Sequence, residues 1–418
     1  MILEKISFRK ADFDVNSYVT TRQLSKSLDG TLYQDELLKV FNANKDKPAV
    51  IKIGNAKQLL SALSDLDAQC EKIDIVSQIR HIQLKRLLED EKAIFEIFEI
   101  KENSILKRKK KDILETETRY SAKTDLLDYY HLSRFANYCR DLEYEDLVNV
   151  IKNYLKGKNA KNKEEKKLRL IYKNEDKQYY LRAITSSQGY KDFGINFSVF
   201  VALMSLNEYV ENTKNEIFIN NFVANDSTIY VSFALKTKTK INQKLSLSFN
   251  LILENDEIKR NAVSFNGIFK LEFEDKEKQS EIYLKPKGFV KEDSNYPTDL
   301  LTYYHRGSVS TVFERIKELP QLIDFYIEQV KKDAERITSI RNPNDVRKLI
   351  SDKIKFSKKP EFKAYKGAVF NKLMNISVNS TFQLFELLRQ VEELFEHDDV
   401  VSRDFWRMKL YESLIERK

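Results

Sequence analysis

The sequence predicts an α+β protein with a central antiparallel sheet, a helical C-terminal region and a smaller α/β N-terminal domain. Three observations support this prediction. Residues 229–235 and 244–253 place apolar side chains at alternate positions, a pattern typical of half-buried antiparallel strands. From residue 300 onward, apolar residues recur at helical spacing. Before residue 106, short runs of both kinds follow one another.

The chain is long enough for more than one domain. Its 418 residues exceed the size at which a single hydrophobic core stops growing, and apolar residues make up 42% of the total. We predict an N-terminal α+β domain at residues 1–106, a basic linker at 107–123, a central α+β domain with the antiparallel sheet at 124–297, and a helical C-terminal region at 298–418.

Local patterns predict the elements of the first half. Residues 2–8 and 93–101 have the composition of strands, and residues 57–70 carry leucines at helical spacing. Residues 124–155 are predicted to be helical. Two aromatic-rich runs then flank the turn-like residues 173–177 and predict a β-hairpin.

The second half combines strands with helices. Ser380 is a suitable N-cap, because its hydroxyl can accept a hydrogen bond from the first turn of the helix that follows. Trp406, the only tryptophan, is expected to be a packing anchor. We expect strands at 229–235, 244–253, 269–273 and 281–284, a buried helix at 197–210, and further helices at 319–340, 381–395 and 404–415.

Composition argues against several classes of protein. Cys70 and Cys139 lie far apart, so neither a disulfide framework nor a zinc site is expected. Only nine glycines occur, without a G-x-G-x-x-G or P-loop motif, which disfavours kinases, P-loop and Rossmann proteins; no cofactor is expected. The chain lacks a signal-peptide pattern and any run of about 18 uncharged apolar residues, so we expect a cytoplasmic protein that does not span a membrane.

Candidate catalytic residues are few. His131 and His305 stand in nearly identical contexts and are the pair that the fold could bring together. Glu99 and Lys101 resemble one half of a carboxylate–lysine nuclease site that would hold Mg²⁺. A chain with so many acids and lysines produces this spacing by chance as well. Catalysis is therefore left open, and binding without catalysis is favoured.

Residues 124–131 and 298–305 are nearly the same, TDLLDYYH and TDLLTYYH. Thr-Asp before an apolar run is typical of a helix start, where a carboxylate lies near the positive end of the helix. The Tyr-Tyr-His part needs another explanation. Tyrosines beside Arg134 and Arg306 resemble the aromatic and cationic groups that hold single-stranded bases, although they could equally be core residues. Tyr130, Arg134 and Tyr138 would share one helical face.

Basic residues are concentrated in two runs. Residues 107–111 read KRKKK, and residues 152–169 carry eight Lys and Arg against two Glu. Such runs can be solvated loops, but they can also contact phosphates. The predicted nucleic-acid-binding residues are Lys107, Arg108, Lys109, Lys110, Lys111, Tyr129, Tyr130, Arg134, Lys156, Lys158, Lys161, Lys163, Lys166, Lys167, Tyr303, Tyr304 and Arg306.

Residues 181–197 read LRAITSSQGYKDFGINF and carry Arg182, Ala183, Ser187, Tyr190 and Asn196. With these positions the chain, over about residues 180–410, resembles a phage- and plasmid-encoded domain family of unknown function. The resemblance implies a protein of a mobile element that handles DNA, and it adds no catalytic residue. Gly189 departs from the serine-to-tyrosine spacing of the family.

These observations favour a nucleic-acid-binding protein, for single-stranded DNA, of a bacterium or its mobile elements. Two alternatives stay open. One is a Mg²⁺-dependent nuclease in anti-phage defence, and the other is a protein-interaction module whose helical C-terminal region docks a partner. The expected partner is nucleic acid, with a homo-oligomer or a protein partner also possible and no membrane involved.

Overall fold

The computed structural model describes most of the chain. The described residues are 6–9, 11–43, 48–89, 91–100, 105, 113–156, 163–258, 262–275, 278–286, 300–338, 340–360, 362–396 and 399–416.

The chain forms two compact units. Unit 1 comprises Met1–Ala62, Gly194–Asn255 and Ala262–Lys418, and unit 2 comprises Leu63–Phe193 and Asp256–Asn261. The chain combines helices with a large antiparallel sheet, which confirms the predicted α+β class. The division into four parts made from the sequence remains a prediction.

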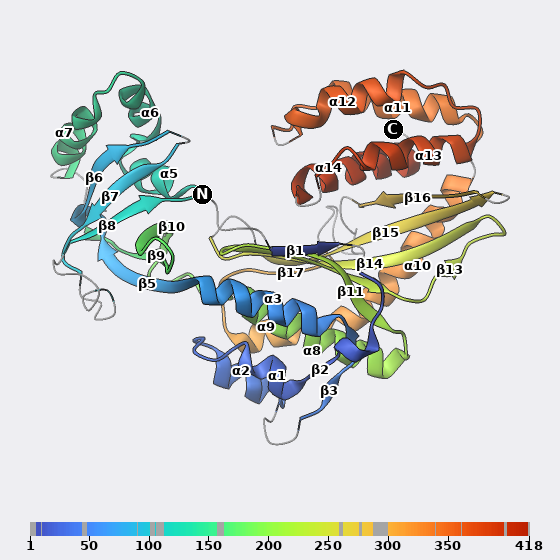
Figure 1. Cartoon of the computed structure of the whole chain (residues 1–418), viewed down its shortest axis with the longest axis horizontal. Helices are drawn as coiled ribbons and strands as arrows, with labels where there is room; N and C mark the ends of the chain where they lie inside the picture. The colour runs from blue at the N-terminus through green and yellow to red at the C-terminus, as the bar shows by residue number, and fades with distance from the viewer. Residues whose placement is uncertain are drawn as a thin grey trace. The chain divides into compact units, whose positions relative to one another are not determined.

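A nine-stranded sheet forms the centre of unit 1. Its main strands follow the order β1-β11-β12-β14-β15-β16, and the pairs β1–β11, β11–β12, β14–β15 and β15–β16 are antiparallel (Figure 1). The strands expected in this region are confirmed. Their bounds are β1 (Ile6–Arg9), β4 (Ile53–Gly54), β11 (Ile217–Ala224), β12 (Thr228–Leu235), β13 (Thr239–Lys240), β14 (Leu245–Asp256), β15 (Val263–Asp275), β16 (Lys278–Leu284) and β17 (Leu301–Tyr303).

Helices account for most of the rest of unit 1. Ser380 caps its helix as predicted, by accepting a hydrogen bond from the backbone N–H of Gln383, and Trp406 is fully buried, as expected of a packing anchor. The bounds are α1 (Thr21–Lys26), α2 (Gln34–Val40), α3 (Ala56–Gln69, of which residues 63–69 belong to unit 2), α8 (Ile195–Thr213), α9 (Val309–Ile316), α10 (Leu319–Thr338), α11 (Pro343–Lys355), α12 (Lys363–Met374), α13 (Thr381–Glu392) and α14 (Val400–Tyr411). Short elements are η1 (Val15–Ser17), β2 (Val19–Thr20) and β3 (Val50–Ile51).

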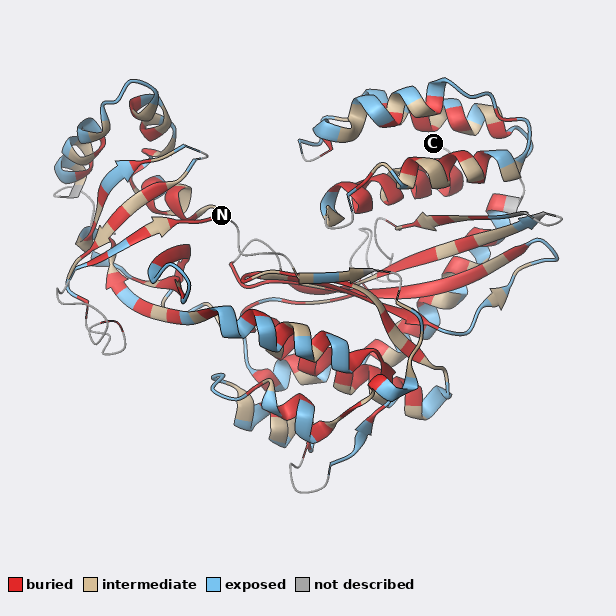
Figure 2. Cartoon of the chain, viewed as in Figure 1, coloured by how far each residue is buried: buried red, intermediate tan, exposed pale blue. Residues whose placement is uncertain are grey.

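The sheet of unit 1 buries both of its faces, as the runs of buried residues in Figure 2 show. On the apolar face, the ring of Phe249 packs against Tyr326 of α10 at 4.7 Å between centroids. On the other face, Ser248 and Asn250 are only 6% and 7% exposed. These strands are therefore buried on both faces rather than half-buried as predicted, and side chains of α13 and α14 line a cavity over the polar face together with Asn250.

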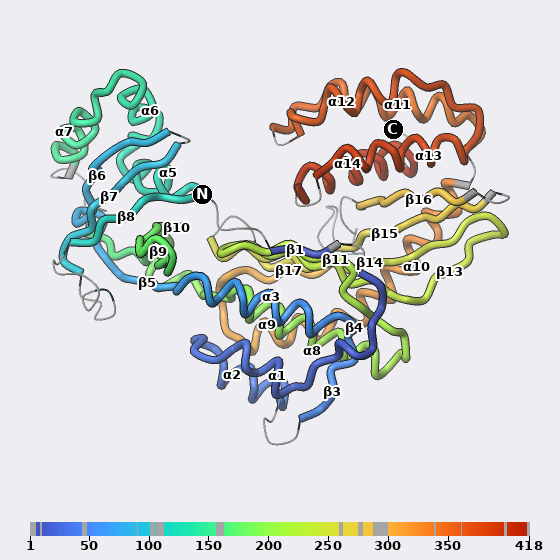
Figure 3. The backbone as a smooth tube through the Cα atoms, in the orientation of Figure 1, coloured from blue at the N-terminus to red at the C-terminus, as the bar shows by residue number. Residues whose placement is uncertain are grey.

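Unit 2 is built on a six-stranded sheet with the order β5-β9-β10-β8-β7-β6. β9 and β10 form the predicted hairpin, while β10 and β8 are parallel, so the sheet is mixed. Figure 3 shows the course of the backbone through these strands. The bounds are β5 (Cys70–Gln78), η2 (Ile79–His81), β6 (Ile82–Leu87), β7 (Ala93–Ile97), β8 (Leu114–Thr118), α5 (Ala122–Leu127), η3 (Asp128–Tyr130), α6 (Ser133–Asp141), α7 (Glu145–Lys156), β9 (Glu165–Lys173) and β10 (Gln178–Ser186).

The two nearly identical segments adopt different structures. In unit 2, residues 124–131 form the end of α5 and the turn η3, and His131 has a left-handed φ of 56° that stops the helix. In unit 1, Leu301–Tyr303 instead forms β17, which pairs with β15 through Phe265, Ser264 and Val263. The expectation that residue 300 onward is helical is therefore wrong at its start. Because a break separates η3 from α6, Tyr130, Arg134 and Tyr138 do not share one continuous helical face.

Within the described ranges, no helix is both long and apolar enough to cross a bilayer.

Gly267 tests the packing of α10 on the sheet. A Cβ at this position of β15 would overlap the ring of the fully buried Tyr326. Gly267→Ala should lower the free energy of unfolding by about 1–3 kcal/mol, the usual cost of overpacking, as measured by urea denaturation. Gly367→Ala in α12 is the control, because its Cβ would meet no atom within 4 Å; it should stabilise by about 0.5–1 kcal/mol. Equal effects of the two changes would contradict this packing.

Candidate functional site

The structure describes only some of the basic residues that were predicted to bind nucleic acid. Lys163 is exposed, Lys166 is buried with its amine 2.5 Å from Glu164, and Lys167 lies 3.9 Å from Asp74. Lys156 ends α7, but its side chain is not described. Lys107, Arg108, Lys109, Lys110, Lys111, Lys158 and Lys161 lie outside the described residues.

The predicted stacking tyrosines differ in exposure. Tyr130 and Tyr303 are only 4% and 3% exposed, and burial raises the pKa of both phenols, that of Tyr130 to about 12. Neither ring face is open to a ligand. These two tyrosines are therefore core residues, which was the alternative to base stacking. Tyr129 is half-buried, and Tyr304 is 66% exposed. Arg134 in unit 2 and Arg306 in unit 1 are exposed.

The candidate catalytic residues form no site. Glu99 lies beyond the end of β7, with a φ of 58° and its carboxylate 3.4 Å from Nδ1 of His81. Lys101 is outside the described residues. His131 is exposed in unit 2, whereas His305 is buried in unit 1. No group of three or more His, Cys, Asp or Glu that could hold a metal ion exists in the described part of the chain.

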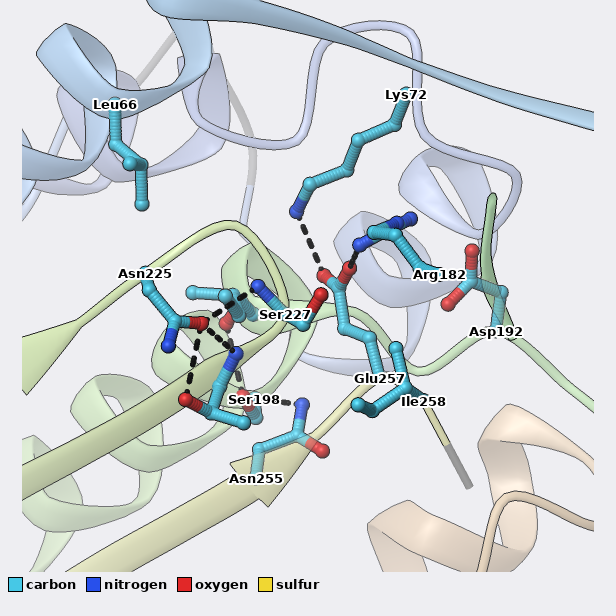
Figure 4. A network of polar contacts seen from close by, with 12 residues as sticks. Leu66, Lys72, Arg182, Asp192, Ser198, Asn225, Ser227, Asn255, Glu257 and Ile258 are labelled. Atoms are coloured by element: carbon cyan, nitrogen blue, oxygen red, sulfur yellow. Dashed lines mark hydrogen bonds and ion pairs between the residues drawn. The ribbon is translucent and has the colours of Figure 1, made fainter. Parts of the chain in front are cut away.

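A buried charge network in unit 2 contains residues of the sequence motif. The Glu257 carboxylate accepts hydrogen bonds from Arg182 at 3.0 Å and from Lys72 at 2.9 Å, as Figure 4 shows. Arg182 and Glu257 are 0% and 2% exposed. Burial alone would raise the pKa of the Glu257 carboxyl, but the charges of Lys72, Arg182 and Arg169 hold that pKa well below its usual range.

Tyr190 and Arg169 extend this network. The hydroxyl of Tyr190 donates to the carbonyl of Glu257 at 2.8 Å, and Arg169 donates to the same carbonyl and to Asp192. Arg169 also lies 3.4 Å from Asp74. The motif residues Arg182 and Tyr190 thus both bind Glu257, one through the carboxylate and the other through the backbone carbonyl. These pairings indicate a structural role.

Glu257→Gln should lower the free energy of unfolding by roughly 3–5 kcal/mol, because it leaves buried cations around a neutral amide. The lowered pKa of Glu257 gives the pH dependence. Its contribution is present above about pH 4.3, the ordinary value for Glu, and is lost as the pH falls toward the folded-state pKa. Urea denaturation between pH 3 and 7 should show this loss in the parent chain and a smaller one in the variant.

Glu175→Gln is the matched control for Glu257→Gln. Glu175 pairs with Lys173 at 2.8 Å in the same unit, but its side chain is 78% exposed. Surface pairs of this kind contribute about 0–1 kcal/mol. If both variants behaved alike, the Glu257 network would not be a stabilising element of unit 2.

A hollow of about 170 Å³ lies on the polar face of the sheet in unit 1. We call it the basic hollow, because its lining contains three lysines and, among the described residues, no carboxylate. Aromatic rings and amides complete its wall. Its lining includes Lys236, Lys238, Lys270, Phe13, Phe218, Tyr283, Asn220, Asn250 and Ser248.

The three lysines reach the basic hollow from different strands or strand ends. Lys236 and Lys238 follow β12 and are about half exposed (49% and 56%), and the Lys236 amine lies 4.3 Å from the ring centroid of Phe13. Lys270 of β15 is more buried. Burial would lower its pKa, but Tyr283, Glu272 and Glu281 outweigh burial and raise it, so the amine stays charged. Each of the three amines is paired with a glutamate outside the lining of the hollow: Lys236 with Glu216 at 2.7 Å, Lys238 with Glu272 at 2.5 Å, and Lys270 with Glu272 and with Glu281 at 3.3 Å. The hollow therefore presents charged ammonium groups of ion pairs beside ring faces.

A second, smaller cavity of about 80 Å³ adjoins the basic hollow and shares Asn220, Asn250 and Tyr283 with it. We call it the arginine cavity. Helices α13 and α14 supply most of its charged side chains, and the strands supply its polar and apolar ones. Its lining is Asn220, Asn221, Tyr230, Ser232, Asn250, Ile252, Ile268, Glu281, Tyr283, Arg389, Glu392, Glu393, Arg403 and Arg407.

The arginines of this cavity differ in their electrostatics. Arg407 donates twice to one oxygen of Glu392, at 2.8 and 2.6 Å, and although its burial acts against the charge, Glu392 and the other anionic partners raise its pKa. Arg403 is 2% exposed, and burial together with the neighbouring Arg407 charge lowers its pKa. Folding thus stabilises the charge of Arg407 but disfavours that of Arg403.

A third hollow of about 300 Å³ shares Lys238 with the basic hollow, and Glu281 and Arg389 with the arginine cavity. The three hollows therefore adjoin one another along the same face. Together they offer cations for anionic groups, ring faces for stacking, and amides and carboxylates for hydrogen bonding.

None of these residues was singled out from the sequence. The alternation of Ser246, Ser248 and Asn250 with leucines was visible, but it indicates only which face is polar, not that helices cover it. Asn220 and Asn221 lie where the register of β11 against β12 shifts. No local sequence pattern predicts this shift. The useful signal is the excess of Asn, Tyr and Lys on the polar face of a strongly predicted sheet.

Comparison with family models, with curated proteins and with solved structures finds no match to the chain.

Proposed function

We propose that the chain binds single-stranded nucleic acid along the polar sheet face of unit 1. The observation that carries the proposal is the basic hollow, where Lys236, Lys238 and Lys270 stand beside Phe13 and Tyr283, with no carboxylate among the described residues of the lining. Lysines suit phosphates, and aromatic faces suit unpaired bases; this combination is typical of single-strand binding.

The position of the rings favours single strands over duplexes. Phe13, Phe218 and Tyr283 are all partly buried, and they lie within the hollow on the sheet face. Bases inside a duplex are stacked on one another and present only their edges, so they could not reach these ring faces. An unpaired base can turn out of the strand and stack there.

The resemblance to mobile-element proteins is consistent with DNA as the ligand. The nuclease alternative has no supporting observation, since Glu99 has no second carboxylate and no metal cluster in the described part of the chain. The interaction-module alternative predicts no affinity for nucleic acid at moderate salt and is thus tested by the same experiment.

Lys236→Gln combined with Lys238→Gln should weaken binding of a fluorescein-labelled single strand about tenfold, as measured by fluorescence anisotropy at about 50 and 200 mM salt. Each lost phosphate contact lowers the slope of log affinity against log salt by about 0.7, so the slope should fall by about 1.4. Duplex DNA and RNA are measured in parallel, and the parent chain should prefer a single strand.

Lys317→Gln combined with Lys331→Gln is the control, because both lysines lie in unit 1 outside the three hollows and, like Lys236 and Lys238, each pairs with a glutamate. This double variant should bind as the parent does. Equal losses in the two double variants, or no binding by the parent to any of the three nucleic acids, would contradict the proposal.

The lysines predicted from the sequence need a separate test. If Lys156, Lys158, Lys161 and Lys163 also contact phosphates, their joint replacement by Ala should flatten the salt slope further. An unchanged slope would leave the basic hollow as the site of phosphate contact and the lysine run as a solvated loop.

A further inference from the structure

The arginine cavity differs from the basic hollow in its charge. Its lining holds three arginines, Arg389, Arg403 and Arg407, and three glutamates, Glu281, Glu392 and Glu393. A phosphate there would meet carboxylates as well as cations. The equal numbers of arginines and glutamates instead suit an uncharged group that offers both hydrogen-bond donors and acceptors.

The walls of the cavity suit a flat ring. Tyr230, Ile252 and Ile268 pack together as an apolar cluster, and Tyr283 lies against it. Its volume of about 80 Å³ far exceeds the roughly 10–15 Å³ that one water molecule needs. An apolar wall with polar groups around it is the usual environment of a bound nucleobase.

The cavity lining also contains acceptors that folding leaves unused. Asn220 Oδ1, Asn221 Oδ1 and Glu392 Oε2 are buried, and none makes a hydrogen bond within the described part of the chain. For Glu392 the reason is geometric, because Arg407 directs both of its hydrogen bonds to the other carboxylate oxygen. Buried acceptors without donors are costly, so a ligand that brings N–H groups would be favoured.

Arg403 supplies the complementary requirement. It lines the same cavity as these acceptors, and a guanidinium carries hydrogen-bond donors only. Acceptor atoms of a ligand in the cavity would therefore suit Arg403. Arginine pairs with the O6 and N7 acceptors of guanine in protein–nucleic acid complexes.

We propose that the arginine cavity is a base-binding subsite selective for guanine. Guanine carries two adjacent donors, N1–H and the N2 amino group, which suit the free oxygen of Glu392 and the amide oxygens of Asn220 and Asn221. Its O6 and N7 acceptors suit Arg403. Adenine lacks the N1–H donor, and a pyrimidine lacks N7. The inference rests on the proposed function, because the neighbouring basic hollow holds the phosphates.

The first experiment varies the ligand and keeps the protein unchanged. Fluorescein-labelled 15-residue oligo-dT strands with a single central dG, dA or dC are compared with oligo-dT by anisotropy, using the parent chain. The dG strand should bind about tenfold more tightly than the other three. Replacing that dG by deoxyinosine, which lacks the N2 amino group, or by 7-deazaguanine, which lacks N7, should remove most of the gain. These comparisons need no variant to fold.

The protein is the second variable. Glu392→Gln should remove the preference for dG, so that the dG strand and oligo-dT bind this variant equally. Glu386→Gln in the same helix is the control, since Glu386 pairs with Arg389 but does not itself line the cavity, and it should keep the preference. Circular dichroism checks that both variants are folded.

The outcomes separate the inference from the proposed function. Equal affinity for all four strands would overturn guanine selectivity and leave single-strand binding intact. No binding of any strand, together with thermal stabilisation by guanosine 5′-monophosphate and not by the adenosine analogue, would overturn the proposed function and support the cavity as a guanine site. No response to any of these ligands would overturn both.

Discussion

Unit 1 depends on the burial of both faces of its sheet. The apolar face lies against α10, where Tyr326 occupies the space that Gly267 leaves open. Part of the polar face is buried as well, so side chains such as Ser248 and Asn250 lose water and need partners inside the protein. The Arg407–Glu392 pair between α14 and α13 meets part of that need. The hollows lie where the remaining polar groups are not fully matched.

Two sets of buried charges in the chain differ in whether their surroundings stabilise the charged form. In unit 2, Glu257 is surrounded by Lys72, Arg169 and Arg182, and its pKa is lowered because these charges stabilise the anion. In unit 1, the pKa of Arg403 is lowered although it is a cation, because burial and Arg407 disfavour its charge. The first arrangement stabilises a fold. The second places a cation where burial acts against its charge.

Residues of the sequence motif illustrate how a conspicuous pattern can be structural. Arg182 and Tyr190 both hold the peptide at Glu257, through the carboxylate and the carbonyl respectively. The residues that line the hollows come instead from several strands of the sheet and from α13 and α14, and each is unremarkable in its own segment. A set of hollows assembled in this way has no local signature, because its members are brought together only by strand pairing and helix packing.

The sequence by itself determined the α+β class, the strands from residue 229 to 284, the hairpin after residue 165, and the Ser380 cap, because these follow from local periodicity and hydrogen bonding. Tertiary structure decided the rest. The same LL-x-YYH letters are helical in unit 2 and include the strand β17 in unit 1, where the ladder with β15 outweighs local preference. Burial of Tyr130 and Tyr303, and enclosure of Asn250, likewise depend on long-range packing, which short-range pattern does not encode.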